Sequence, residues 1–352
     1  MPSKPSLITL DGSHGEGGGA LLRAALCASA LTEQGVTIYN IRGGMRHPGL
    51  DAEDLTLIEA LKECTAAEAF GVGLKSERFT FIPSRKPTGI NGRLSTFRNE
   101  SNRGPNVPIV LNCLLPVLAR SGVYSSLSLE GETYGANSLG FDAFQNLSVE
   151  AQKVLGLYCF PTQIAAGFGR ESRGEIQIDV EPSHLEGADW TDRGQLVEIG
   201  AVVATANLPA NVGDRGVAHL RSLSKQAGIQ LEAEHRELES ASPGCHVTVW
   251  ARYERGFGGA SAIGTRGVRV ETLCQTTFSA TLGWMQSNAC FDAYVAEQVL
   301  PTAVFAESPT TMTVSELTGR LLTSVWVMKQ FLPIHLTVKG NEGEPGVISV
   351  RR

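Results

Sequence analysis

The sequence predicts an α+β protein of three related β-α-β-α-β-β units, with a small α/β domain inserted between the second unit and the third. Strand-length and helix-length apolar runs alternate over most of the 352 residues, and one internal stretch has strands and a helix of its own. A hydrophobic content of 42% is enough for one large core or two smaller ones. We therefore expect residues 1–181 and 276–352 to form the repeat core, and residues 182–275 to form the inserted domain.

The first unit is predicted from the N-terminal part of the chain. Its apolar patterns place a strand at 7–10, a helix at 20–31, a strand at 36–41, a helix at 51–64, and strands at 79–83 and 92–97. Asp51 stands where it can cap the second helix. This order of elements is typical of a split βαβ layer.

The same order recurs less completely further along the chain. The second unit is indicated by a helix at 108–119, a strand at 123–129, a helix at 138–155 and a strand at 175–180. The third is indicated by helical stretches at 276–305 and 317–331 and a closing strand at 334–338. The inserted domain has strands at 195–203 and 246–253 and a helix at 215–227.

A glycine-rich segment joins the first strand to the first helix and reads Asp-Gly-Ser-His-Gly-Glu-Gly-Gly-Gly-Ala over residues 11–20. Glycines let backbone N–H groups turn toward one ligand, and a helix start adds unpaired donors and a partial positive charge. Phosphate next to Gly17, Gly18 and Gly19 is the ligand that this pattern favours. Glu16 would repel a phosphate unless a divalent cation lies between them or a hydroxyl contacts it, so we interpret Glu16 as a metal or ribose ligand.

Two other interpretations of this segment stay open. Gly15, Gly17 and Ala20 fit a loosened dinucleotide pattern, and Arg42 could then meet the 2′-phosphate of NADP. The small residues could also simply form a tight turn that lets a helix pack on a sheet. The segment is not a Walker A sequence, because no Gly-Lys-Ser/Thr follows the glycines.

The composition of the chain excludes several classes of function. The net charge of −6 means that nucleic acid must be bound by a local basic patch, so general RNA coating is not expected. The seven cysteines are widely spaced without a Cys-x-x-Cys pair, which favours a reducing compartment and argues against structural zinc. No signal-peptide core and no apolar run of membrane-spanning length is present. We expect a cytoplasmic protein without a membrane partner.

Motifs in order along nearly the whole chain resemble those of the RNA 3′-terminal phosphate cyclase family. They are the glycine segment, Ile41-Arg42, Pro48-Gly49-Leu50, Leu55-Thr56, Asp192-Arg193-Gly194, Leu208-Pro209, Asp214-Arg215, Gly264, Glu271 and residues 292–301. The resemblance implies three split βαβ repeats with an inserted domain, a fold similar to that of enolpyruvyl transferases such as EPSP synthase. It also implies a reaction in which a histidine takes AMP from ATP and passes it to an RNA 3′-phosphate, which closes to a 2′,3′-cyclic phosphate.

The resemblance further implies partners and roles for individual residues. The partners are ATP, Mg²⁺ or Mn²⁺, and an RNA 3′ end. The implied roles are metal and ribose binding for Glu16, phosphate contacts for Arg23 and Arg42, and an adenosine pocket for Phe257, Tyr294, Glu297 and Gln298. From spacing alone, Tyr294 and Gln298 could equally lie on one face of an ordinary helix.

The chain departs from the family at the nucleophile. Aligned on Phe331-Leu332-Pro333, the position of the nucleophilic histidine is occupied by Arg320. A guanidinium stays protonated and has no lone pair, so it cannot form the phosphoramidate. Residues 102–106, 169–174 and the pair Glu53-Asp54 depart as well.

We therefore expect the usual covalent step to be lost. Arg320 is predicted to point into the same cleft as Glu16 and Tyr294 and to bind a phosphate there, and the alternative is a surface arginine on an amphipathic helix. Three functional hypotheses remain. The first is an RNA 3′-phosphate cyclase, an ATP-dependent ligase, or a nucleotidyl transferase that has diverged from one. The second is a non-catalytic RNA-processing or ribosome-assembly factor of the cyclase-like type, and the third is an NADP-dependent oxidoreductase. The last depends only on the dinucleotide pattern and Arg42.

Overall fold

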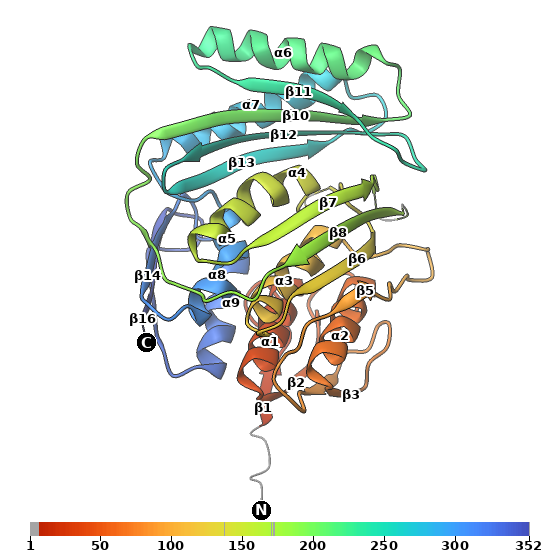
Figure 1. Cartoon of the computed structure of the whole chain (residues 1–352), viewed down its shortest axis with the longest axis vertical. Coiled ribbons are helices and arrows are strands. Elements are labelled where there is room, and N and C mark those ends of the chain that lie inside the picture. Colours follow the sequence, from red (N-terminus) through yellow and green to blue (C-terminus); the bar gives the residue numbers. More distant parts are fainter. Residues whose placement is uncertain (1–6, 137, 170, 172, 352) are drawn as a thin grey trace, which may run out of the picture.

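The computed structural model describes residues 7–136, 138–169, 171 and 173–351, and Figure 1 shows an α+β fold. Within these residues the strands form four sheets of four strands each. Three of the sheets belong to units with the predicted element order, and the fourth belongs to the inserted unit. No helix among the described residues is long and apolar enough to cross a membrane.

The first unit has the sheet order β1-β2-β4-β3. Its elements are β1 (Leu7–Asp11), α1 (Gly19–Thr32), β2 (Gly35–Tyr39), α2 (Ala52–Thr65), β3 (Glu68–Phe70) and β4 (Phe79–Ile82). β1 and β2 are parallel, whereas β4 is antiparallel to both β2 and β3. The predicted cap of α2 is confirmed, because Asp51 Oδ1 accepts a hydrogen bond from the backbone N–H of Asp54 at 3.0 Å.

The second unit repeats this order as β5-β6-β8-β7. Its elements are β5 (Asn91–Arg93), α3 (Val107–Ala119), β6 (Ser125–Gly131), a helical segment of α4 (Phe141–Ala143), the π-helical η1 (Phe144–Val149) and α5 (Glu150–Val154), then β7 (Cys159–Ala165) and β8 (Gly174–Val180). The prediction that the strand at 92–97 closes the first unit is wrong. That strand is β5, which pairs in parallel with β6 and opens the second unit.

The third unit has the same order again, β9-β14-β16-β15. Its elements are β9 (Asp189–Trp190), α8 (Val295–Phe305), β14 (Thr310–Val314), α9 (Gly319–Phe331), β15 (His335–Lys339) and β16 (Gly346–Arg351). The strand predicted to close the chain is β15, but β16 follows it and inserts between β14 and β15. The helical stretch predicted at 276–305 is divided between two separate helices.

The inserted unit interrupts the third unit between β9 and α8. It comprises β10 (Leu196–Ala206), α6 (Asn211–Ala227), β11 (Glu232–Glu237), β12 (Gly244–Tyr253), β13 (Gly256–Ile263) and α7 (Val270–Gln286). In Figure 1 it lies at the top, with α6 outermost. The boundary expected at residue 275 falls inside α7, which packs on β12 and β13. We propose that the unit extends to the end of α7.

The two faces of the inserted sheet have different neighbours. Val203 and Val249 face a separate small core under α6 and α7. Val202, Trp250 and Phe257 belong to the large core shared with the repeat units. The insertion therefore has a core of its own but is also packed firmly onto the body of the protein.

The topology gathers the connecting segments of the three units. In each unit the first two strands are parallel, as in β1 with β2, β5 with β6, and β9 with β14. The carboxyl ends of two parallel neighbours lie at the same edge of a sheet, and ligands of α/β structures bind there. α1 also packs against α2, α3 and α9, so the helices that follow these strands meet in the centre of the molecule (Figure 1).

Candidate functional site

A cavity of about 280 Å³ opens where connections from all three units meet. Its lining comes from segments that follow the first or second strand of a unit. The lining residues are Glu16, Gly18, Gly19, Arg23, Arg42, Met45, Asp51, Ala52, Glu53, Asn99, Arg103, Gly104, Asn106, Ile109, Ser138 and Arg320. The starts of α1, α2, α3 and α9 all lie at or next to this cavity, which we call the cleft.

The glycine segment is held against α9 of the third unit. Gly15 and Gly17 both have a φ of 65°, in the left-handed region that favours glycine. A Cβ on Gly15 would lie 2.1 Å from Thr323 Oγ1, so the backbone can approach α9 closely only with glycine. Thr323 Oγ1 also accepts a hydrogen bond from the backbone N–H of Glu16 at 3.0 Å. The loop is therefore shaped by contacts between the two units.

Glu16 lies at the start of α1. Gly18 is the N-cap of this helix and has no side chain with which to cap it. Glu16 Oε1 lies 3.4 Å from the backbone N–H of Ala20, and a Cβ on Gly18 would come within 2.6 Å of the same oxygen. The loop thus places one half-buried carboxylate beside the positive end of a helix.

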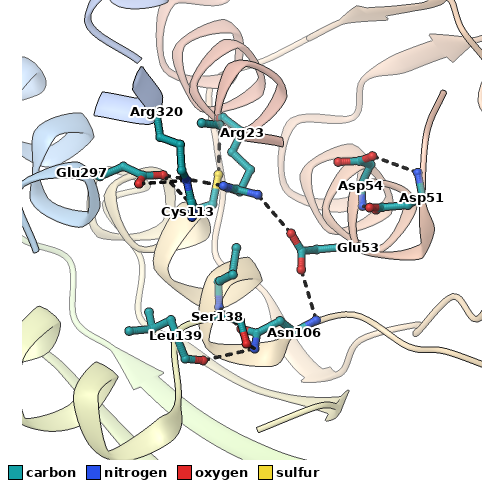
Figure 2. Close-up of polar contacts among 12 residues, drawn as sticks. Arg23, Asp51, Glu53, Asp54, Asn106, Cys113, Ser138, Leu139, Glu297 and Arg320 are labelled. Carbon is teal, nitrogen blue, oxygen red and sulfur yellow. Dashed lines mark hydrogen bonds and ion pairs between the residues drawn. The ribbon is translucent and has the colours of Figure 1, made fainter. Parts of the chain in front are cut away.

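Two arginines of the cleft share one carboxylate (Figure 2). Arg320 Nε lies 3.2 Å from Glu297 Oε2, and Arg23 Nη2 lies 3.7 Å from Glu297 Oε1. Arg23 also pairs with Glu53 at 3.1 Å. Burial opposes the charge of Arg23, but Glu53 and Glu297 outweigh it and raise the pKa of the guanidinium above its ordinary value. Arg23 and Arg320 are thus fixed, charged donors at one wall of the cleft.

Arg42 is tied into the turn that precedes α2. Its guanidinium makes two hydrogen bonds to Asp54, at 2.6 and 3.1 Å, and donates to the backbone oxygen of Gly49 at 2.7 Å. Asp51 lies 3.2 Å away. Burial works against the charge, but Asp54 keeps the pKa of Arg42 above its ordinary value. Arg42 lines the cleft, as a phosphate contact would, but its donors hold the turn together.

The residues implied for an adenosine pocket differ in exposure and surroundings. Phe257 is 5% exposed in the core, with its ring stacked on Phe291 at 6.2 Å, whereas Tyr294 is 58% exposed at the start of α8. The backbone oxygen of Gln298 accepts a hydrogen bond from Asn112 Nδ2 at 3.1 Å. None of these three predicted residues lines the cleft. Arg320 therefore shares the cleft with Glu16 but not with Tyr294.

The second unit contributes a wall to which the sequence assigned no binding residue, although it marked residues 102–106 as a departure from the family. Asn99, Arg103, Asn106 and Ser138 line the cleft, and the first three lie in the connection from β5 to α3. This connection is the counterpart of the glycine segment, a correspondence that becomes visible only once β5 is placed in the second unit. Of the other segment that departs from the family, at 169–174, Arg170 and Ser172 lie outside the described residues.

The three carboxylates that line the cleft, Glu16, Asp51 and Glu53, do not gather into a metal cage. Among the residues that the structure describes, no group of three or more His, Cys, Asp or Glu side chains could hold a metal ion. Glu16 is the carboxylate beside the glycine segment, and Mg²⁺ is commonly held by one or two carboxylates together with phosphate oxygens of a substrate. The donor set therefore fits a metal bound jointly by Glu16 and a phosphate ligand.

Fold and site together define a three-unit α+β protein with a glycine-loop cleft at the meeting point of its units. The family described as RNA 3′-terminal phosphate cyclase matches residues 14–338. The chain belongs to this family.

Relatives bearing the name RNA 3′-terminal phosphate cyclase match almost end to end. One from Archaeoglobus fulgidus is 30% identical over 336 residues, covering 96% of this chain and 99% of its own. One from Thermococcus onnurineus is 31% identical over 355 residues, covering 98% and 99%. Among solved structures, the enolpyruvyl transferase NikO from Streptomyces tendae aligns with 98% of this chain and 48% of its own at 13% identity and a TM-score of 0.37. The fold is defined by the repeated units and not by that likeness.

Proposed function

We propose that this RNA 3′-terminal phosphate cyclase-like protein binds ATP with Mg²⁺ or Mn²⁺ at the glycine segment, and an RNA 3′ end in the same cleft. One observation carries the proposal: the glycine loop, Glu16, Arg23 and Arg320 all line one cavity. Backbone donors at a helix start together with fixed guanidinium groups are suited to phosphate oxygens. The names of the relatives give the proposal its substrate class.

The metal follows from the charges of the cleft. Glu16 lies where phosphate oxygens would approach the start of α1, and a carboxylate repels a phosphate. A divalent cation between the two reverses the sign of that interaction. We therefore propose Glu16 as a metal ligand and expect ATP binding to depend on the metal.

The covalent step of the family is not part of this proposal. No histidine occurs among the residues that line the cleft, and Arg320 at the nucleophile position offers no lone pair. Its ion pair with Glu297 fixes a cation that strengthens ground-state binding of an anion. This observation favours the second candidate, a non-catalytic RNA-processing or ribosome-assembly factor that holds a nucleotide and an RNA end.

An NADP-dependent oxidoreductase is not proposed. The dinucleotide pattern requires a series of parallel strands after the first βαβ unit. In this chain β4 is antiparallel to β2, and β1 and β2 are the one parallel pair of that sheet among the described residues.

Calorimetric titration of the full chain with ATP plus MgCl₂ or MnCl₂ tests the proposal. We expect binding, and a loss of affinity of about tenfold or more in Glu16→Ala, because one charged metal ligand is removed. Glu63→Ala is the matched control, since this acid is exposed near the far end of α2. No binding at millimolar ATP, or an affinity that Glu16→Ala leaves unchanged, would refute the site.

A further inference from the structure

Four arginines line the cleft, and three of them face carboxylates. Arg23 pairs with Glu53 and Glu297, Arg42 with Asp54, and Arg320 with Glu297. The exposed side chain of the fourth, Arg103, has no acidic partner among the residues that the structure describes. Its full positive charge is therefore available to a ligand in the cleft.

The backbone around Arg103 is fixed by hydrogen bonds. Asn99 Oδ1 accepts a hydrogen bond from the N–H of Arg103 at 3.0 Å, and the oxygen of Arg103 accepts one from the N–H of Asn99 at 3.0 Å. Arg98 Nη1 donates to the oxygen of Asn102 at 3.0 Å, and Arg98 Nη2 reaches Glu130 on β6 at 2.8 Å. The turn is thus braced against the sheet of the second unit and presents Arg103 from a defined position.

Glu53 lies between the first and second units in the cleft. One of its oxygens pairs with Arg23, and the other accepts a hydrogen bond from the backbone N–H of Asn106 at 3.2 Å. Figure 2 shows this carboxylate between Arg23 on one side and Asn106 on the other. Glu53 offsets the charge of Arg23, whereas the charge of Arg103 is not offset by an ion pair among the described residues. Arg23 and Arg103 thus line the cleft from different units.

We propose that Arg103 binds the terminal phosphate monoester of an RNA 3′ end, so that the cleft distinguishes a 3′-phosphate from a 3′-hydroxyl. This inference rests on the proposed function and assigns its second ligand. A phosphate monoester carries a charge of about −1.5 to −2 at pH 7, more than an internal phosphodiester. A guanidinium can bind two of its oxygens through a planar pair of N–H groups. Arg103 is accordingly a specificity-determining residue.

Fluorescence anisotropy with two labelled oligoribonucleotides of one sequence, ending in a 3′-phosphate or a 3′-hydroxyl, tests the inference. We expect the wild-type protein to prefer the 3′-phosphate by about 10- to 100-fold, the range of a hydrogen bond to a charged group. Arg103→Gln should reduce the preference to about twofold or less, and Arg103→Lys should retain part of it, because charge remains without the planar fork. Arg46→Gln is the control, since Arg46 is exposed and does not line the cleft.

Calorimetry with ATP and MgCl₂ in the absence of RNA separates this inference from the proposed function. Arg103→Gln should bind ATP as the wild-type protein does. If the wild-type protein binds ATP but binds both oligonucleotides equally or neither, the inference is overturned while the nucleotide site stands. If Arg103→Gln weakens ATP binding as much as RNA binding, Arg103 belongs to the nucleotide site and the inference is again overturned. A 3′-phosphate preference without ATP binding would support Arg103 and refute the nucleotide half of the proposed function.

Discussion

The first and third units share one strand order but use the connection after their first strand differently. In the first unit, residues 12–18 lead directly from β1 to α1 and form the glycine segment of the cleft. In the third unit, β9 leads into the inserted unit, and the chain reaches α8 only at Val295. The sheets are thus a common scaffold, and the connections carry the specialised roles. One connection builds a charged cleft, whereas the other builds a buried interface with the second unit.

The largest loss of stability is expected on breaking the buried ion pair of Arg42 and Asp54, which holds the turn at the cleft. Asp54→Ala leaves the guanidinium of Arg42 without its bidentate partner, and the free energy of unfolding should fall by about 3 to 5 kcal/mol. Urea unfolding should be measured at pH 8, because burial raises the pKa of Asp54 to about 7. In the control Glu100→Ala, which removes the exposed pair of Lys75 and Glu100, we expect no measurable loss. A loss below about 1 kcal/mol for Asp54→Ala would mean that the pair does not hold the turn.

The interface between the inserted unit and the second unit should lose stability at low pH because of His246. This histidine lies fully buried on β12, with its ring 4.8 Å from that of Tyr134 in the second unit, and burial lowers its pKa to about 3. The unfolded chain binds a proton below about pH 6.5 that the folded protein does not, so stability falls as the pH falls from about 6.5 toward 3. The free energy of unfolding of the wild-type protein should be about 2 kcal/mol lower at pH 5 than at pH 7 because of this histidine.

His246→Gln isolates this contribution. The difference in unfolding free energy between variant and wild type should shift by that amount in favour of the variant between pH 7 and pH 5. Asp142, whose pKa burial raises to about 6 against the pull of Arg236, lies at the same interface and titrates in both proteins, so it largely cancels in the difference. A pH-independent difference would show that the pKa of His246 is not lowered in the folded protein.

A smaller effect is expected where the first unit meets the third. Gly15→Ala places a side chain in the left-handed region and against Thr323 Oγ1, and should cost about 1 to 2 kcal/mol in urea unfolding. Gly44→Ala is the matched control, because nothing lies within 4 Å of the Cβ that it would add and its φ is not positive. Equal stabilities for the two variants would mean that the glycine segment does not depend on its close contact with α9.

The sequence predicted local elements well where periodicity and caps coincide. The helices α1 and α2 begin within a residue of their predicted starts, since glycine precedes one and Asp51 caps the other. β3 was missed because it has only three residues, and β5 was assigned to the wrong unit because strand pairing is a tertiary property.

The composition of the cleft was only partly predictable. Glu16 and the glycines were found because the chemistry of their pattern is local. The importance of Arg103 was not, because a cation is known to lack a partner only after the carboxylates have been located in space. Glu297 on α8 pairs with Arg23 on α1 of the first unit and with Arg320 on α9 of its own unit, so no spacing along the chain indicates these ion pairs.

We propose that the cleft binds ATP but has lost its nucleophile at Arg320. Incubation with α-labelled ATP and MnCl₂, followed by a denaturing gel, tests it most directly. We expect no protein-bound label in the wild-type protein or in Arg320→Gln, and acid-labile label in Arg320→His, because imidazole supplies the missing lone pair. Label on the wild-type protein would show that the cleft still has a nucleophile and would contradict the proposed loss.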